Sequence, residues 1–178
     1  MGSSHRVWLL ALFGLGLLLV GPPRARAVVV GNGSCGLDPD ACLGNSGDIG
    51  TQSCNGDSAC ENNSGRIHNL ACNAESACEN NSGAVNNDSC NGFEACEDNS
   101  GVVGTGACKG RLACGANSAP VGNTSCRGVA ACAGNTGTIG NNSCNGDFAC
   151  CGNSAPIGPG QCNGAPVGGV GVCQGPCI

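Results

Sequence analysis

A cysteine repeat with a period of 18 residues constrains this chain more than any other feature. Two cysteines stand six positions apart in each unit, and an earlier unit holds Cys35 and Cys42 with one extra residue between them. Uninterrupted units of fixed length predict stacked coils in which each coil contacts its neighbours. The first column is Cys54, Cys72, Cys90, Cys108, Cys126, Cys144 and Cys162, and the second is Cys42, Cys60, Cys78, Cys96, Cys114, Cys132 and Cys150.

Two other columns keep the same period. We expect the aliphatic column to fill a thin interior and the asparagine column to form a buried amide ladder, in which each side chain bonds the next coil. The aliphatic column is Ile49, Ile67, Val85, Val103, Val121, Ile139 and Ile157. The asparagine column is Asn45, Asn63, Asn81, Asn99, Asn117, Asn135 and Asn153.

The local sequence favours short extended segments joined by turns. Gly, Asn and Ser recur every few residues, and no window shows the apolar periodicity of a helix. We place the "NG" and "NSG" sequences at the corners, because Asn and Gly accept a positive φ. The fold class that follows is all-β, a disulfide-stapled β-solenoid (β-helix) of about seven 18-residue coils, with strands about 4.8 Å apart.

The cysteines could pair within a coil or between coils. The loop-entropy estimates, about 2.4 kcal/mol for the short loop and about 3.2 kcal/mol for the long one, are too close to decide. Parity favours pairs within coils, because the units from Cys35 to Cys150 then contain seven complete pairs. Four cysteines remain and would staple a carboxyl-terminal cap, unless one of them forms an intermolecular bond: Cys151, Cys162, Cys173 and Cys177.

Residues 1–27 have the pattern of a signal peptide. A charged start and the apolar run "VWLLALFGLGLLLV" precede "ARA", a typical cleavage site. Cleavage leaves a repeat region at 28–161 and a Gly/Pro-rich cap or tail at 162–178, and we expect no membrane span in this secreted, extracellular chain. The mature chain keeps all 12 acidic residues and four of seven basic ones, a net charge of −8, which excludes nucleic acid as a partner.

The repeated units resemble known secreted proteins. The stretch "IGNNSCNGDFACCGNSA" (139–155) is similar to uncharacterised secreted repeat proteins built from S-C-N-G-x-x-A-C-x-x-N-S-G units, and this resemblance covers roughly residues 31–162. The cysteine spacing also resembles that of the disulfide-stapled β-solenoids of beetle antifreeze proteins. That resemblance implies a β-solenoid and an ice-binding threonine face. The chain departs from it because its coils are longer and its five threonines, at positions 51, 105, 124, 136 and 138, do not lie in one common column.

Candidate site residues are few. Glu61, Glu79 and Glu97 form an acidic column, which we interpret as a solvated face, with calcium binding as the sharper alternative. His68 is the one histidine of the mature chain and we place it at an outward corner, because no catalytic partner surrounds it. We therefore expect no enzyme activity and no cofactor.

These patterns predict a secreted, non-enzymatic structural or surface-interaction repeat protein. The alternatives are an ice-binding or mineral-binding solenoid and a calcium-binding extracellular repeat protein. Charge also suggests weak head-to-tail self-association, because residues 28–98 carry a net charge of −10 and residues 99–178 a net charge of +2. A tail that folds over the last coil would block this contact.

Overall fold

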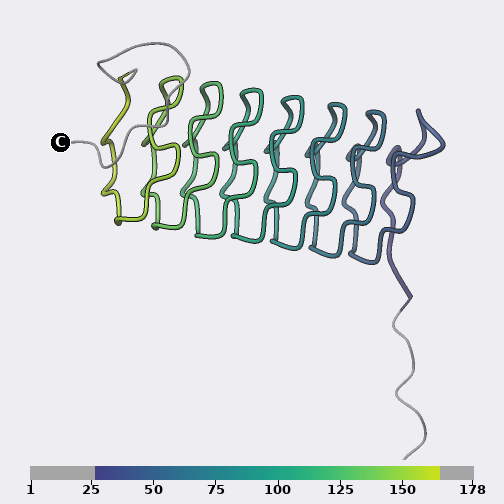
Figure 1. Cartoon of the computed structure of the whole chain (residues 1–178). Helices are drawn as coiled ribbons and strands as arrows, with labels where there is room; N and C mark the ends of the chain where they lie inside the picture. Colours follow the sequence, from purple (N-terminus) through teal and green to yellow (C-terminus); the bar gives the residue numbers. More distant parts are fainter. Residues whose placement is uncertain (1–26, 165–178) are drawn as a thin grey trace, which may run out of the picture.

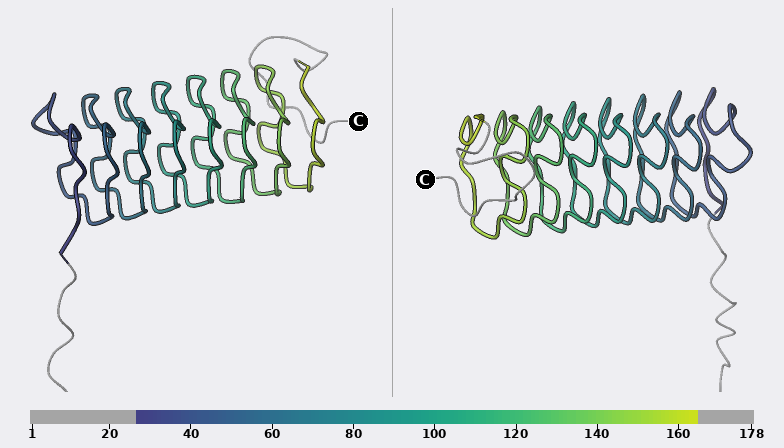
Figure 2. Two further views of the ribbon diagram at one scale, coloured as in Figure 1. Left: turned by 180° about the vertical axis from the view of Figure 1, so that it is seen from behind. Right: turned by 45° about the horizontal axis from the view of Figure 1, so that its top comes forward.

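The computed structural model describes residues 27–164, which form a stack of similar coils along one axis (Figure 1). Two further views show the coils side by side from one end of the stack to the other (Figure 2). The expected signal peptide, apart from residue 27, and the expected tail beyond residue 164 lie outside the described residues. The coils span 30–48, 49–66, 67–84, 85–102, 103–120, 121–138 and 139–156, and residues 157–164 begin another.

The described residues contain neither an α-helix nor a strand of several residues. Their extended structure consists of isolated parallel bridges that join each residue of the aliphatic column to the next, from Val30–Ile49 to Ile139–Ile157. The predicted all-β class is therefore wrong. A β-solenoid is built from strands that pair over several residues, whereas each coil here contributes a single bridged residue. The repeating unit of the stack is instead a series of turns.

Left-handed backbone conformations explain why strands do not form. Four residues of the coil 67–84 have positive φ angles: Leu70 (59°), Cys72 (56°), Ser76 (48°) and Asn80 (53°). Each such residue redirects the chain, so an extended segment ends after a few residues. The first cysteine column adopts this conformation throughout, from Cys35 to Cys162. A cysteine or a leucine in a sequence does not indicate a left-handed backbone conformation.

The glycines of the "NSG" sequences serve close packing rather than turning. Neither Gly65 nor Gly83 has a positive φ, so their expected role as left-handed corners is wrong. A Cβ atom on Gly83 would lie 2.1 Å from the carbonyl oxygen of Gly101 in the next coil. Glycine is required there because the neighbouring backbone leaves no room for a side chain.

The interior is thin and consists of small apolar groups. Ile67, Val85 and Val103 of the aliphatic column are at most 1% exposed. They lie in one cluster with the disulfides and with a column of buried alanines. The alanines are Ala59, Ala77, Ala95, Ala113, Ala131 and Ala149.

Backbone hydrogen bonds join each coil to its neighbours. The N–H of Cys78 donates to the carbonyl of Ala59 in the preceding coil at 2.7 Å, and Cys96 donates to Ala77 at the same distance. In the described part of the chain, every buried side-chain nitrogen and oxygen also has a hydrogen-bond partner. The stack thus satisfies its buried polar side chains without a sheet. Residues 27–164 include no helix that could cross a membrane.

Candidate functional site

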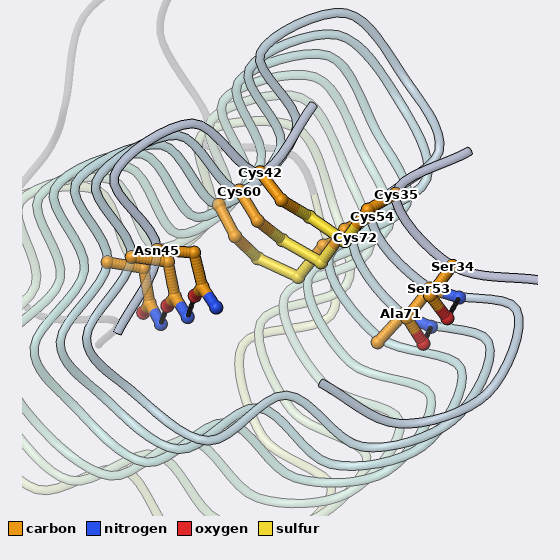
Figure 3. Close-up of a disulfide and its surroundings, with 12 residues drawn as sticks. Ser34, Cys35, Cys42, Asn45, Ser53, Cys54, Cys60, Ala71 and Cys72 are labelled. Carbon is orange, nitrogen blue, oxygen red and sulfur yellow. Dashed lines mark hydrogen bonds between the residues drawn. A yellow bond between two sulfur atoms is a disulfide. The ribbon is translucent and has the colours of Figure 1, made fainter. Parts of the chain in front are cut away.

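Seven disulfides cross the interior, one in each complete coil. Each joins the two cysteines of the same coil over a Cα–Cα distance of 5.5 to 5.6 Å, which is the within-coil pattern that parity favours. Figure 3 shows Cys35–Cys42 and Cys54–Cys60 side by side. The sulfurs of Cys72, Cys78 and Cys90 lie within 4.8 Å of one another. Because metal ligation requires thiolates, these oxidised sulfurs do not form a metal site.

The last cysteines also form disulfides. Cys151 and Cys162 are disulfide-bonded, and none of the cysteines that the structure describes is a free thiol. Cys173 and Cys177 lie outside the described residues.

The buried asparagine column forms the amide ladder that the sequence predicts (Figure 3). The Nδ2 of Asn99 donates to the Oδ1 of Asn81 in the preceding coil and to the carbonyl of Gly101, both at 2.8 Å. The Oδ1 of Asn99 in turn accepts a hydrogen bond from Asn117 at 2.9 Å. Each amide therefore fixes its own turn and connects two neighbouring coils.

A serine column bridges the coils on the opposite side of the disulfides (Figure 3). The Oγ of Ser53 donates to the carbonyl of His68 at 2.7 Å and accepts the N–H of Ala71 at 3.2 Å, both in the next coil. Ala71 and Ala107 occupy this column without a hydroxyl, so the bridge is interrupted at two coils. The other members of the column are Ser34, Ser89, Ser125, Ser143 and Gln161.

An outer asparagine column lies next to the first cysteine column. The Oδ1 of Asn73 accepts the N–H of Asn55 at 3.3 Å, and its Nδ2 donates to the carbonyl of Gln52 at 3.0 Å. The column is polar but varied, and its members are Asn55, Asn73, Asn91, Lys109, Arg127, Asn145 and Asn163.

The acidic column lies half-buried on the outside of the stack. Burial raises the pKa of the Glu97 carboxyl, and the nearby carboxylates of Glu94, Glu79 and Asp98 raise it further. Glu61, Glu79 and Glu97 do not belong to any group of three ligand atoms within 4.8 Å in the described chain. The column is therefore an arrangement of repelling charges, and calcium binding stays a prediction.

His68 and the basic residues are involved in local contacts. His68 is half-buried, and its carbonyl accepts the Ser53 hydroxyl bond, while its imidazole makes no hydrogen bond with the described residues. Lys109 forms an ion pair with Asp88 at 2.5 Å. The guanidinium of Arg111 lies 5.2 Å from the ring centroid of Phe93, a distance suited to a cation–π contact.

An exposed hydroxyl column was not predicted from the sequence. One hydroxyl residue in every complete coil lies outside the stack, directly after the buried asparagine, and its side chain makes no hydrogen bond to the described residues. The sequence signal was available, because Ser or Thr follows each asparagine of that column. The hydroxyl column is Ser46, Ser64, Ser82, Ser100, Ser118, Thr136 and Ser154.

Comparison with known proteins gives one match. A family model described as "Domain of unknown function (DUF7640)" matches residues 63–167, more than half of the chain. The curated proteins and the solved structures contain no significant match.

Proposed function

The chain belongs to the family described as a domain of unknown function (DUF7640), and since that membership brings no activity, we propose from the geometry that it is a secreted, non-enzymatic rod that presents repeated side chains to a surface. Its seven internal disulfides support an oxidising, extracellular environment. Its thin interior and its hydrogen-bonded coils support a rigid structural role rather than a catalytic one.

The hydroxyl column is the observation that carries this proposal. The buried asparagine, serine and cysteine columns all have a structural task, because their polar atoms connect one coil to the next or close a coil. The hydroxyl column has no such task within the described residues, yet it recurs in every complete coil and is exposed in all of them. Exposed polar groups that a fold does not need are candidates for binding. The stack would hold these hydroxyls in a row about 4.8 Å apart.

An adsorption assay tests the proposal. The oxidised protein would be incubated with insoluble polysaccharide, calcium mineral and ice, and the bound fraction would be measured. We expect retention on at least one surface, and about tenfold weaker retention when Ser82, Ser100 and Ser118 are changed together to valine, because the central row of donors is lost. A chain that binds none of these surfaces contradicts the proposal.

A matched control removes the same number of exposed hydroxyls elsewhere. Thr51, Thr105 and Thr138 are exposed and lie outside the hydroxyl column. Changing these three threonines to valine is expected to leave retention unchanged. Equal losses in both triple variants would show that general hydrophilicity, and not the column, causes adsorption.

Ice or mineral binding is the more specific form of this function. A regular row of hydroxyls favours a partner with a repeating lattice over a partner with a single epitope. Thermal hysteresis and ice recrystallisation assays test the ice form directly. Activity there, lost in the triple serine variant, would support it, and adsorption to polysaccharide alone would exclude it.

A further inference from the structure

The exposed large apolar side chains gather at one end of the stack. Five of eight such residues belong to the first coil or directly precede it, and Leu37 is the most exposed at 82%. The remaining three, Leu70, Val102 and Val129, are spread along the flanks. Exposed apolar side chains that are concentrated in one coil indicate an interaction surface. The five residues are Val28, Val29, Val30, Leu37 and Leu43.

The backbone at this end also has unused hydrogen-bonding groups. Inside the stack, Ile67 directs both its N–H and its carbonyl to the preceding coil, where they bond Asp48 and Gly50. Val30 occupies the equivalent position in the first coil, and no coil precedes it within the described residues. Among the described residues, neither the N–H nor the carbonyl of Val30 has a partner. The first coil is therefore an open edge that invites another chain.

The two ends of the stack differ. Val30 is 50% exposed, whereas Ile157, the last residue of the same ladder, is 8% exposed. Ala149 and Cys150 near the carboxyl-terminal end are 7% and 1% exposed. The ladder residue is therefore exposed in the first coil and buried at the last bridge that the structure describes.

We propose that two copies of the chain associate through their first coils, with Val30 of one copy paired antiparallel to Val30 of the second copy. A residue that directs its N–H and carbonyl to the same side can exchange both bonds with the same residue of a two-fold-related strand. The pairing extends the hydrogen bonding between coils across the dimer axis. It would also cover apolar side chains of the first coil that are exposed in the single chain. It is independent of the surface to which the rod binds.

Charge distinguishes this dimer from a head-to-tail assembly. Residues 28–48 contain Asp38, Asp40 and Asp48 and no basic residue, so two first coils repel each other at low ionic strength. The salt of a physiological buffer screens exposed charges over about 8 Å, and association should strengthen as salt is added. A head-to-tail contact between an acidic end and a basic end would instead weaken as salt is added.

Sedimentation velocity tests the proposal on the full chain expressed in a secreting, oxidising host. The expected result is a monomer–dimer equilibrium without larger species, and tighter at high salt. Leu37→Lys should weaken the dimer about tenfold or more, because it places a charge on the most exposed apolar side chain of the first coil. Val30→Pro should weaken it similarly, because it removes an N–H that no described residue accepts. Disulfide mapping and thermal melting establish that each variant is folded.

Val102→Lys is the matched control, because Val102 is 48% exposed on the flank of the stack. It should leave the dimer unchanged. Monomers at all concentrations, or a series of growing species that salt dissolves, would overturn the proposal. So would folded Val30→Pro and Leu37→Lys variants that dimerise as tightly as the parent chain.

Discussion

The buried asparagine column and the outer asparagine column carry the same side chain under different constraints. The buried column is asparagine in all seven complete coils, whereas the outer column contains Lys109 and Arg127 among its asparagines. Both columns make hydrogen bonds between coils, as Asn99 does inside and Asn73 does outside. The two columns differ in their access to water. An outer backbone group that loses its asparagine can bond solvent, but a buried carbonyl that loses its amide has no replacement.

This comparison shows which features of the repeat the fold needs. The buried asparagine repeats without exception because a neighbouring coil depends on its amide and water cannot enter. The outer asparagine varies because its position is partly exposed to solvent. Four changes to the protein test this comparison, and their expected effects on stability decrease from the first to the last.

Reduction of the disulfides should unfold the stack, and in the unfolded chain neither of the two asparagine columns is buried. Seven loops of this length contribute roughly 16 kcal/mol by the loop-entropy estimate, more than the typical net stability of a domain. We expect the reduced chain to unfold, which circular dichroism and thermal melting would report. A reduced chain that melts cooperatively like the oxidised one would show that hydrogen bonds alone hold the stack.

Asn99→Ala should be far more harmful than Asn91→Ala. The buried variant leaves the carbonyl of Gly101 and the amides of Asn81 and Asn117 without their partner, and we expect a loss of about 3 kcal/mol in the free energy of unfolding. The outer variant should lose less than about 1 kcal/mol, because water replaces its bonds. Denaturant unfolding of the two variants measures both values. Similar losses would refute the role of burial.

Ala71→Ser should stabilise the stack by about 1 kcal/mol. The new hydroxyl would donate to the carbonyl of Asn86 and accept the N–H of Ser89, by analogy with Ser53 one coil earlier. Neither group has a hydrogen-bond partner among the described residues. Ala84→Ser, outside the serine column, is the control and should be neutral. An unchanged or lower melting temperature for Ala71→Ser would contradict the bridging role.

Glu97→Gln should give the smallest effect, a slight gain in stability at neutral pH. Burial and the neighbouring carboxylates raise the pKa of Glu97 in the folded chain above its unfolded value. The folded state therefore binds more protons than the unfolded state between those values, and its stability falls as the pH rises through that window. Glu97→Gln should therefore be more stable than the parent chain above this pH window and equally stable below it. Added salt should reduce the difference. A gain that does not depend on pH would argue against charge repulsion.

The sequence predicted the period and the columns because both follow from side chains that recur in register. The amide ladder followed from an asparagine that never varies, and the parity of the cysteines favoured pairs within coils. The absence of strands was not predictable, because Cys72, Leu70 and Ser76 give no sequence signal of a left-handed backbone. The open first coil required the structure, since exposure depends on which coil lacks a neighbour. The hydroxyl column is visible in the sequence as a Ser or Thr after each buried asparagine, but its exposure required the structure.

Amide hydrogen exchange on the oxidised protein tests most directly whether backbone bonds between coils hold the stack. The amides of Cys78, Cys96 and Cys114 are buried and donate to the preceding coil at 2.7 Å, so they should exchange most slowly. The amides of Gly92 and Phe93, in the same coil as Cys96, have no acceptor among the described residues and should exchange fast. Equally fast exchange at the cysteine amides and at Gly92 and Phe93 would contradict the stacked arrangement.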